Sequence, residues 1–206
     1  MAGRRSLRVV PRFVLASGSP RRRQLLEKAG YKFDVVLPAF AEVSSPGLTI
    51  RETTACNALR KAVEVAQSAP GAVVLGADTL VALDGRVIGK PATLADAARI
   101  LRRLSGRVHE VWTSVFVCYP ARGKAHSFQE VSHVHFRRLN NRTIANYLAK
   151  VDPLDKAGAY AAQGHGTEII KRIDGSYTNV VGLPMEQSAR VLRSFGIYAS
   201  RISNRS

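Results

Sequence analysis

The chain of 206 residues carries 31 Lys and Arg against 15 Asp and Glu, a formal net charge of +16, and 46% of its residues are hydrophobic. This length suits one good-sized domain or two small lobes, and the composition is that of an ordinary globular protein. No apolar run approaches the ~18 residues of a membrane span, and the N-terminus lacks the apolar core of a secretory signal, so we expect a cytoplasmic protein.

The cysteines, Cys56 and Cys118, are too few for a disulfide framework, and no His/Cys cluster has the spacing of a zinc site. We therefore predict two reduced thiols. The strong positive charge favours anionic partners, which include nucleic acid, a membrane surface and phosphorylated small molecules. Because the basic residues are spread along the whole chain, charge alone does not choose among these partners.

Strand and helix patterns alternate along the chain, which predicts an α/β domain. We expect a basic N-terminal arm at residues 1–11, a single domain at 12–199 and a frayed tail at 200–206. The first half should contain a strand at 13–16, a helix that Ser19 caps and Gly30 ends, a strand at 31–40, a polar loop at 41–50 and a helix at 51–68.

The second half begins with a hairpin at 72–91, for which Asp84-Gly85 is a strong two-residue turn signal. Thr93 should cap the helix that follows. The remaining elements are a hairpin of 109–120 with 125–137, a helix from Asn140 or Asn141 to Val151, a glycine-rich loop at 155–166, a strand plus a turn at 167–184 and a last helix at 184–195.

The first hairpin brings candidate chemical groups together. If Asp84-Gly85 is the turn, Thr79 faces Lys90, and directly opposed residues have Cβ atoms only ~5 Å apart. Asp78 precedes Thr79 and follows the apolar run 73–75, at a strand position where chemistry often occurs in α/β folds. The alternative interpretation is an ordinary surface pair of Asp and Lys, which contributes little.

The segment SGSPRRR, residues 17–23, leads into the first helix. Backbone N–H groups and the hydroxyls of Ser17 and Ser19 at such a turn bind phosphate readily. Arginine adds bidentate hydrogen bonds to phosphate. Three cations at a helix N-terminus oppose the helix dipole, and a bound polyphosphate would reverse that opposition. The alternative is a solvated basic helix end.

The segment DKAGAYAAQGHG, residues 155–166, places Lys156 and Gln163 among three glycines. The amide of a Gln can read a nucleobase edge, although glycine-rich stretches are often plain loops. No GxxxxGK[ST] sequence occurs, and no GxGxxG follows a strand, which disfavours a standard NTPase or dinucleotide enzyme. A GxSxG elbow is absent too.

Six segments in this order resemble the Maf family of nucleoside triphosphate pyrophosphatases. They are LASGSPRRRQLLEKAG, NALRKA, GADTLVALDGRVIGKP, LSGRVHEVWTSV, DKAGAYAAQGHG and IDGSYTNVVGLPM, within residues 15–185. The resemblance implies a Maf/ITPase-like α/β fold, with a mixed twisted sheet, flanking helices and two lobes around a deep cleft. It also implies cleavage of a nucleoside triphosphate to the monophosphate and pyrophosphate with a divalent metal, and frequently a homodimer.

Family roles carry over where the motifs match. Asp78 takes the place of the proton acceptor, and Glu42 that of an acidic residue linked to metal and phosphate. With Ser19 and Lys156 from the residues themselves, the predicted substrate-binding set is Ser17, Ser19, Arg21, Arg22, Lys61, Thr79, Lys90, Lys156 and Gln163. The forms SPRR, ADT and AAQG are similar to the branch that acts on dTTP and UTP.

The resulting hypothesis is hydrolysis at the α-phosphorus. Mg²⁺ or Mn²⁺, held by the triphosphate, Asp78 and Glu42, would lower the pKa of water and screen charge, while Asp78 orients or deprotonates that water. The cationic side chains would neutralise the pyrophosphate, and Gln163 would read the base. Arg23 should be a solvated surface residue.

Two alternatives stay open at this point. One is the same chemistry on 7-methyl-GTP or another modified nucleotide. The other is a basic nucleic-acid-binding module without catalysis, which the absence of a recognised RNA or DNA motif disfavours. We expect no membrane partner and no specific nucleic acid partner.

Overall fold

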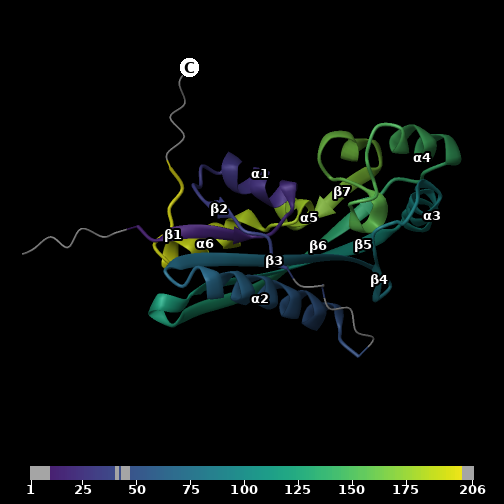
Figure 1. The fold of residues 1–206 in the computed structure, drawn as a ribbon. Helices are drawn as coiled ribbons and strands as arrows, with labels where there is room; N and C mark the ends of the chain where they lie inside the picture. The colour runs from purple at the N-terminus through teal and green to yellow at the C-terminus, as the bar shows by residue number, and fades with distance from the viewer. Residues whose placement is uncertain (1–9, 40–41, 43–46, 201–206) are drawn as a thin grey trace, which may run out of the picture.

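Two strands of twelve residues each, β3 and β5, run through the molecule and connect its two ends (Figure 1). In the computed structural model, which describes residues 10–39, 42 and 47–200, they form the centre of a mixed sheet. The strands are β1 (Arg12–Ala16), β2 (Asp34–Val35), β3 (Ala72–Leu83), β4 (Arg86–Ile88), β5 (Val108–Tyr119), β6 (Lys124–Phe136) and β7 (Ile170–Asp174). Their order is β2-β1-β3-β5-β6-β7, and β4 pairs with β3.

Helices cover both faces of this sheet. Figure 1 shows α1, α5 and α6 on one face, α2 on the other, and α3 and α4 at the end where β4 and β7 lie. The helices are α1 (Pro20–Lys28), α2 (Ile50–Ser68), α3 (Leu94–Leu104), α4 (Asn141–Leu148), α5 (Tyr177–Val181) and α6 (Met185–Ser194). Three short 3₁₀ turns are η1 (Pro120–Arg122), η2 (Ala157–Ala159) and η3 (Gly164–Glu168). The predicted α/β class, with a mixed sheet and flanking helices, is therefore confirmed.

The hydrophobic residues gather at the two ends of the long strands. At one end, Leu26 and Leu192 pack with Leu75 on one face, while Ala62 of α2 packs with Val74 on the other. The other end has its own core around α3, α4 and the far halves of β3 and β5; its fully buried members include Leu101, Leu104, Tyr147 and Ile169. Two lobes thus share one sheet, and β3 and β5 fix them relative to one another.

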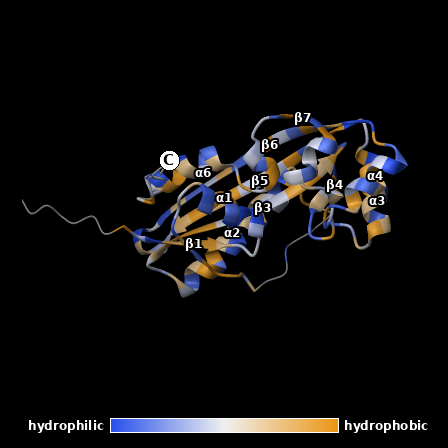
Figure 2. Cartoon of the chain, turned by 90° about the horizontal axis from the view of Figure 1, so that it is seen from above, coloured by the Kyte–Doolittle hydropathy of each residue, from blue (hydrophilic) through white to orange (hydrophobic). Residues whose placement is uncertain are grey.

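Local signals set most helix starts as predicted. The Ser19 side chain accepts from the backbone N–H of Arg22 at 3.5 Å, and Pro20 is the first residue of α1. Thr93 and Asn140 cap α3 and α4 in the same way. In Figure 2, α1 contains a strongly hydrophilic stretch, whereas β1 is coloured mainly as hydrophobic. This contrast is expected because β1 is buried between two layers of helices.

Both predicted hairpins form. Leu83 pairs with Arg86 around the Asp84-Gly85 turn, whose two residues have the positive φ values of 52° and 72° that such a turn requires. The second hairpin joins β5 to β6 around η1. The predicted opposition of Thr79 and Lys90 is wrong as a strand pairing, because the β3–β4 ladder ends at Val81 and Ile88.

Three other predictions need correction. The strand predicted at 31–40 is reduced to the two residues of β2, because the chain leaves β1 before Pro38, which has no N–H to donate. The turn predicted after β7 contains the short helix α5, which Ser176 caps. The helix expected to reach Val151 ends at Leu148.

Some predictions concern residues outside the described ranges. Residues 1–9 of the predicted basic arm and 201–206 of the predicted tail lie there, as do residues 41 and 43–46 of the polar loop predicted at 41–50. Cys56 and Cys118 are free thiols, as predicted. Among the helices that the structure describes, none has the length and apolarity needed to cross a membrane.

Candidate active site

One edge of β3 has a gap in its pairing, and a cavity lies beside it. On this edge β1 pairs with residues 72–76 and β4 with residues 81–83, so 77–80 have no strand partner there among residues 10–39, 42 and 47–200. The other edge is continuously paired with β5 from Val74 to Ala82. The cavity has a volume of about 490 Å³, and both lobes line it. It lies beyond the carboxyl end of β1, where ligands commonly bind in α/β sheets.

Asp78 projects from the gap toward α2. The residue is 4% exposed, and each oxygen of its carboxylate accepts a hydrogen bond from that helix. Lys61 Nζ donates to Oδ1 at 2.7 Å, and Asn57 Nδ2 donates to Oδ2 at 3.2 Å. Asn57 and Lys61 lie one helical turn apart and therefore share a face of α2. The alternative of an ordinary surface pair of Asp78 and Lys90 is wrong, because Asp78 is buried and forms its ion pair with the equally buried Lys61.

Gly76 explains how α2 comes so close to β3. A Cβ at this position would lie 2.4 Å from the carbonyl oxygen of Ala58 and 2.7 Å from the backbone nitrogen of Ala62. Only a residue without a side chain permits this approach. The close packing brings Asn57 and Lys61 within hydrogen-bond distance of Asp78, two residues along the strand on the same face.

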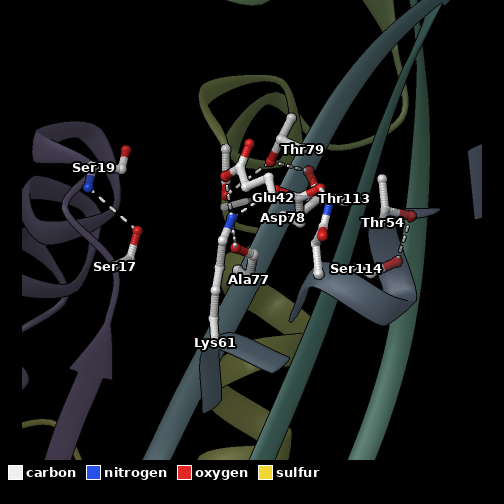
Figure 3. A network of polar contacts seen from close by, with 12 residues as sticks. Ser17, Ser19, Glu42, Thr54, Lys61, Ala77, Asp78, Thr79, Thr113 and Ser114 are labelled. Atoms are coloured by element: carbon white, nitrogen blue, oxygen red, sulfur yellow. Dashed lines mark hydrogen bonds and ion pairs between the residues drawn. The ribbon is translucent and has the colours of Figure 1, made fainter. Parts of the chain in front are cut away.

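Lys61 also joins Asp78 to Glu42. Its Nζ donates to Glu42 Oε1 at 2.5 Å and to the carbonyl oxygen of Ala77 at 3.4 Å, and Figure 3 shows the ammonium between the two carboxylates. Partial burial raises the pKa of Glu42, but the hydrogen bond and charge of Lys61, with two further cations, outweigh it, and the net pKa lies below the ordinary value. Both acids thus face one buried cation.

The serine loop before α1 forms the opposite wall. Ser17 is 5% exposed, and its Oγ accepts from the backbone N–H of Ser19 at 3.2 Å and from Arg22 Nη1 at 3.0 Å. A hydroxyl has two acceptor sites and one donor, so these contacts leave the proton of Ser17 available for a ligand. The hydroxyl of Ser19 caps α1.

Arg22 is the buried member of the three consecutive arginines. It is 8% exposed, and within the described part of the chain its guanidinium donates to neutral oxygens alone: Gly182 O at 2.8 Å, Ser17 Oγ at 3.0 Å and Thr79 Oγ1 at 3.0 Å. Burial lowers the pKa of Arg22. The negative charges of Asp78 and Glu42 oppose that shift, although neither carboxylate is a hydrogen-bond partner of Arg22 within the described residues. An arginine remains protonated even so, and its positive charge faces the cavity.

Asp155 forms ion pairs with two of the predicted cations, Arg21 and Lys156. Arg21 Nη1 donates to Asp155 Oδ2 at 2.7 Å, which links α1 of one lobe to the loop before η2 of the other. Lys156 donates to Asp155 as well and to the carbonyl oxygen of Asp152 at 2.6 Å. Burial raises the pKa of Asp155, but its bonds to Lys156 and Arg21 outweigh this and lower it overall. The carboxylate of Asp155 therefore binds Arg21 and Lys156, two of the cations that were predicted to bind phosphate.

Every residue of the predicted site lines this one cavity: Ser17, Ser19, Arg21, Arg22, Glu42, Lys61, Asp78, Thr79, Lys90, Lys156 and Gln163. Lys90 is exposed and reaches the cavity from the segment after β4, where Gly89 O accepts from the backbone N–H of Gly158. Gln163 lies just before η3. Arg23 instead pairs with Glu27 at 2.7 Å on the outer face of α1 and is exposed, as predicted.

Three residues of this site were missed from the sequence. Asn57 holds Asp78, Asp155 holds Arg21, and Thr113 contacts Thr79 across the sheet. The spacing of Asn57 and Lys61 within NALRKA was an available signal, because residues four apart share a helix face. No local pattern indicates which strand lies beside Thr79, so the sequence could not identify Thr113 as part of the site.

The fold and the cavity define an α/β protein with a cationic cleft around one buried carboxylate. The chain belongs to the Maf family: the family model described as "Maf-like protein" matches residues 12–195. A Pelotomaculum thermopropionicum protein named dTTP/UTP pyrophosphatase is 45% identical over 183 residues, which cover 89% of this chain and 96% of that protein. A Bacillus pumilus protein of the same name is 41% identical over 184 residues, with the same coverage of both chains.

Among solved structures, the chain is similar to a HAM1 protein from Coxiella burnetii, with a TM-score of 0.43 and 18% identity. That comparison covers 63% of this chain and 74% of the other. The likeness is too distant to support an inference about this protein.

Proposed function

We propose that this chain hydrolyses dTTP and UTP to the nucleoside monophosphate and pyrophosphate, removing these or related pyrimidine nucleotides from the cellular pool. The observation that carries the proposal is the buried carboxylate of Asp78, held at both oxygens and facing a cavity lined by Arg21, Arg22, Lys90 and Lys156. The names of the relatives supply the substrate class. The predicted homodimer and cytoplasmic location remain predictions.

In this proposal the reaction breaks the bond between the α-phosphorus and the oxygen that bridges it to the β-phosphorus. Water supplies the entering oxygen, and Asp78 accepts its proton as general base. Because Lys61 and Asn57 each donate to a different oxygen of Asp78, the carboxylate is fixed in orientation while lone pairs remain for the water. The leaving pyrophosphate carries the negative charge that Arg22 and its cationic neighbours neutralise.

The acidic residues fit the divalent metal that the family resemblance implies. Mg²⁺ prefers oxygen ligands and is often held by one or two carboxylates together with substrate phosphates. Glu42 and Asp78 supply such a pair, and the described part of the chain contains no group of three or more metal-binding side chains that would offer a different site. Mg²⁺ or Mn²⁺ held there would screen phosphate charge and lower the pKa of water.

The proposal is tested with a panel of nucleoside triphosphates, including 7-methyl-GTP, assayed for pyrophosphate release with Mg²⁺ or Mn²⁺. We expect dTTP and UTP to give the highest kcat/KM. A preference for 7-methyl-GTP would overturn the substrate assignment. RNA binding that is tight and salt-sensitive, without pyrophosphate release from any nucleotide, would overturn the enzymatic function.

A matched pair of variants tests the role of Asp78. Asp78→Asn keeps the shape of the side chain and should lower kcat by ~10²–10⁴, the usual range for loss of a general base. Asp84→Asn makes the same chemical change at the exposed turn of the same hairpin, where Asn tolerates the positive φ of 52°. It should retain wild-type kcat. Equal turnover in the two variants would remove Asp78 from the base role.

A further inference from the structure

The hydroxyl of Thr79 is occupied by contacts within the protein, although Thr79 lines the cavity. Its Oγ1 accepts from Arg22 Nη2 at 3.0 Å, lies 2.9 Å from Thr113 Oγ1, and lies 3.4 Å from the carbonyl oxygen of Gly182. A hydroxyl has a single proton. Because that proton goes to Thr113 or to Gly182, Thr79 has none left to donate to a substrate.

Thr113 continues this chain of hydrogen bonds into the core. It is directly opposite Thr79 in the β3–β5 ladder, it is 0% exposed, and Figure 3 shows the two hydroxyls beside one another. Thr113 Oγ1 also donates to the carbonyl oxygen of Asn179 at 3.4 Å. The hydrogen bonds can therefore all donate in one direction, from Arg22 through Thr79 and Thr113 to the backbone carbonyl of Asn179. The charge of the guanidinium polarises this series of hydrogen bonds.

The other contacts of Arg22 show what this chain of bonds holds in place. An arginine has five N–H groups, and three of them donate to Gly182, Ser17 and Thr79. One N–H remains on each terminal nitrogen, the arrangement that binds a phosphate with two parallel hydrogen bonds. Within the described residues no carboxylate forms an ion pair with Arg22, so neutral oxygens alone set its orientation.

We propose that Thr113 is a positioning residue for phosphate binding, acting through Thr79 on Arg22. Thr79 then influences catalysis by holding the guanidinium, and the fully buried Thr113 does so without touching the substrate. The inference rests on the proposed function for the identity of the substrate. It extends that function by assigning a role to a side chain on β5, one strand away from the cavity.

A double-mutant cycle tests this relay. Thr79→Val and Thr113→Val remove the hydroxyls but keep the branched shape that strands favour. We expect kcat/KM for dTTP to fall about tenfold in Thr79→Val, which loses a hydrogen bond to a charged group, and about fivefold in Thr113→Val, which loses one between neutral groups. The double variant should stay within about twofold of Thr79→Val, because both changes interrupt one path. Thr113→Ser should restore wild-type values.

A second readout separates positioning from general damage to the fold. The affinity for inorganic tripolyphosphate, measured by calorimetry, should fall in Thr113→Val in the same proportion as 1/KM, while Thr113→Ser keeps the wild-type affinity. Ser188→Ala is the control, because it removes a buried hydroxyl that has no hydrogen-bond partner among the described residues. This control should leave both constants unchanged. If Thr113→Val does not fold, Thr113→Ala, which removes the same hydroxyl, is used in its place.

Two results would overturn the relay. In the first, the losses of kcat/KM in the two single variants multiply in the double variant. In the second, Thr113→Val has wild-type kcat/KM while Thr79→Val has a reduced value, which means that Thr79 contacts the substrate itself. Failure of the proposed function looks different: the wild-type protein would bind tripolyphosphate and release no pyrophosphate from dTTP or UTP. The same cycle measured on tripolyphosphate affinity would then still decide the relay.

Discussion

Replacing Gly76 with Ala should disable the enzyme from a position outside the cavity. The added Cβ would lie 2.4 Å from the carbonyl oxygen of Ala58 and 2.7 Å from the backbone nitrogen of Ala62. Ordinary contact begins about 1 Å further out. Both atoms belong to the backbone of α2, so no side-chain rotation relieves the overlap, and the helix itself must move away from β3.

The loss of activity and stability depends on which hydrogen bonds break when α2 moves. Asn57 and Lys61 directly precede the two contacting residues Ala58 and Ala62, and their hydrogen bonds to Asp78 are 3.2 and 2.7 Å long. A displacement of α2 by about 1 Å stretches both beyond hydrogen-bond range. We expect the free energy of unfolding to fall by about 1–3 kcal/mol, as for other overpacked cores, and kcat/KM to fall by ~10², as for a catalytic group misplaced by 1 Å.

Urea unfolding and pyrophosphate release from dTTP measure the two effects separately. Gly71→Ala is the matched control, because no atom lies within 4 Å of its added Cβ and its φ is not in the left-handed region. This control should match the wild type in kcat/KM and equal or exceed it in stability. If Gly76→Ala folds and retains wild-type kcat/KM, the close approach of α2 does not position Asp78, and the explanation given for the site is wrong.

Three further predictions concern other charged groups. Asp155→Asn should lower KM for dTTP severalfold, because it removes the carboxylate that competes with phosphate for Arg21; a raised KM would contradict this. Arg23→Ala should leave kcat/KM within about twofold, since this exposed residue pairs with its own helix. His109 is neutral when folded, because burial lowers its pKa to about 4 from the ordinary ~6.5. The contribution of the lowered His109 pKa to the free energy of unfolding is therefore complete above pH ~6.5. It is lost as the pH falls toward 4, and the free energy of unfolding decreases by up to about 3 kcal/mol. Urea unfolding at both pH values should show this loss in the wild type and a smaller loss in His109→Gln.

The sequence was most informative where a structure depends on neighbouring residues. The caps at Ser19 and Thr93 and the Asp84-Gly85 turn were predicted correctly, and the cap of α4 was narrowed to Asn140 or Asn141, because each is decided by a side chain or a backbone angle within a few residues. The strand predicted at 31–40 failed because alternating apolar residues do not specify a partner. Strand pairing there depends on how far β1 extends, which is a property of the whole sheet.

The members of the site were predicted more completely than their contacts. Extrapolating the hairpin placed Lys90 opposite Thr79, whereas in the structure Asp78 has Lys61 as its ion-pair partner. The reason is physical: Lys61 reaches Asp78 only because α2 packs against β3 at Gly76, and that packing is a long-range event. Family motifs identify which residues matter, but they do not state which side chain each one holds.

The three arginines at the start of α1 differ in how their charges are balanced. Consecutive helical residues point about 100° apart, so each meets different surroundings. Arg23 pairs with Glu27 of its own helix, and Arg21 pairs with Asp155 across the cavity. Arg22, the most buried, has neutral oxygens as its hydrogen-bond partners among the residues that the structure describes, at the positive end of the helix dipole. Of these three arginines, the one without a carboxylate partner among the described residues is thus held in place beside the cavity, where a phosphate group would supply a negative charge.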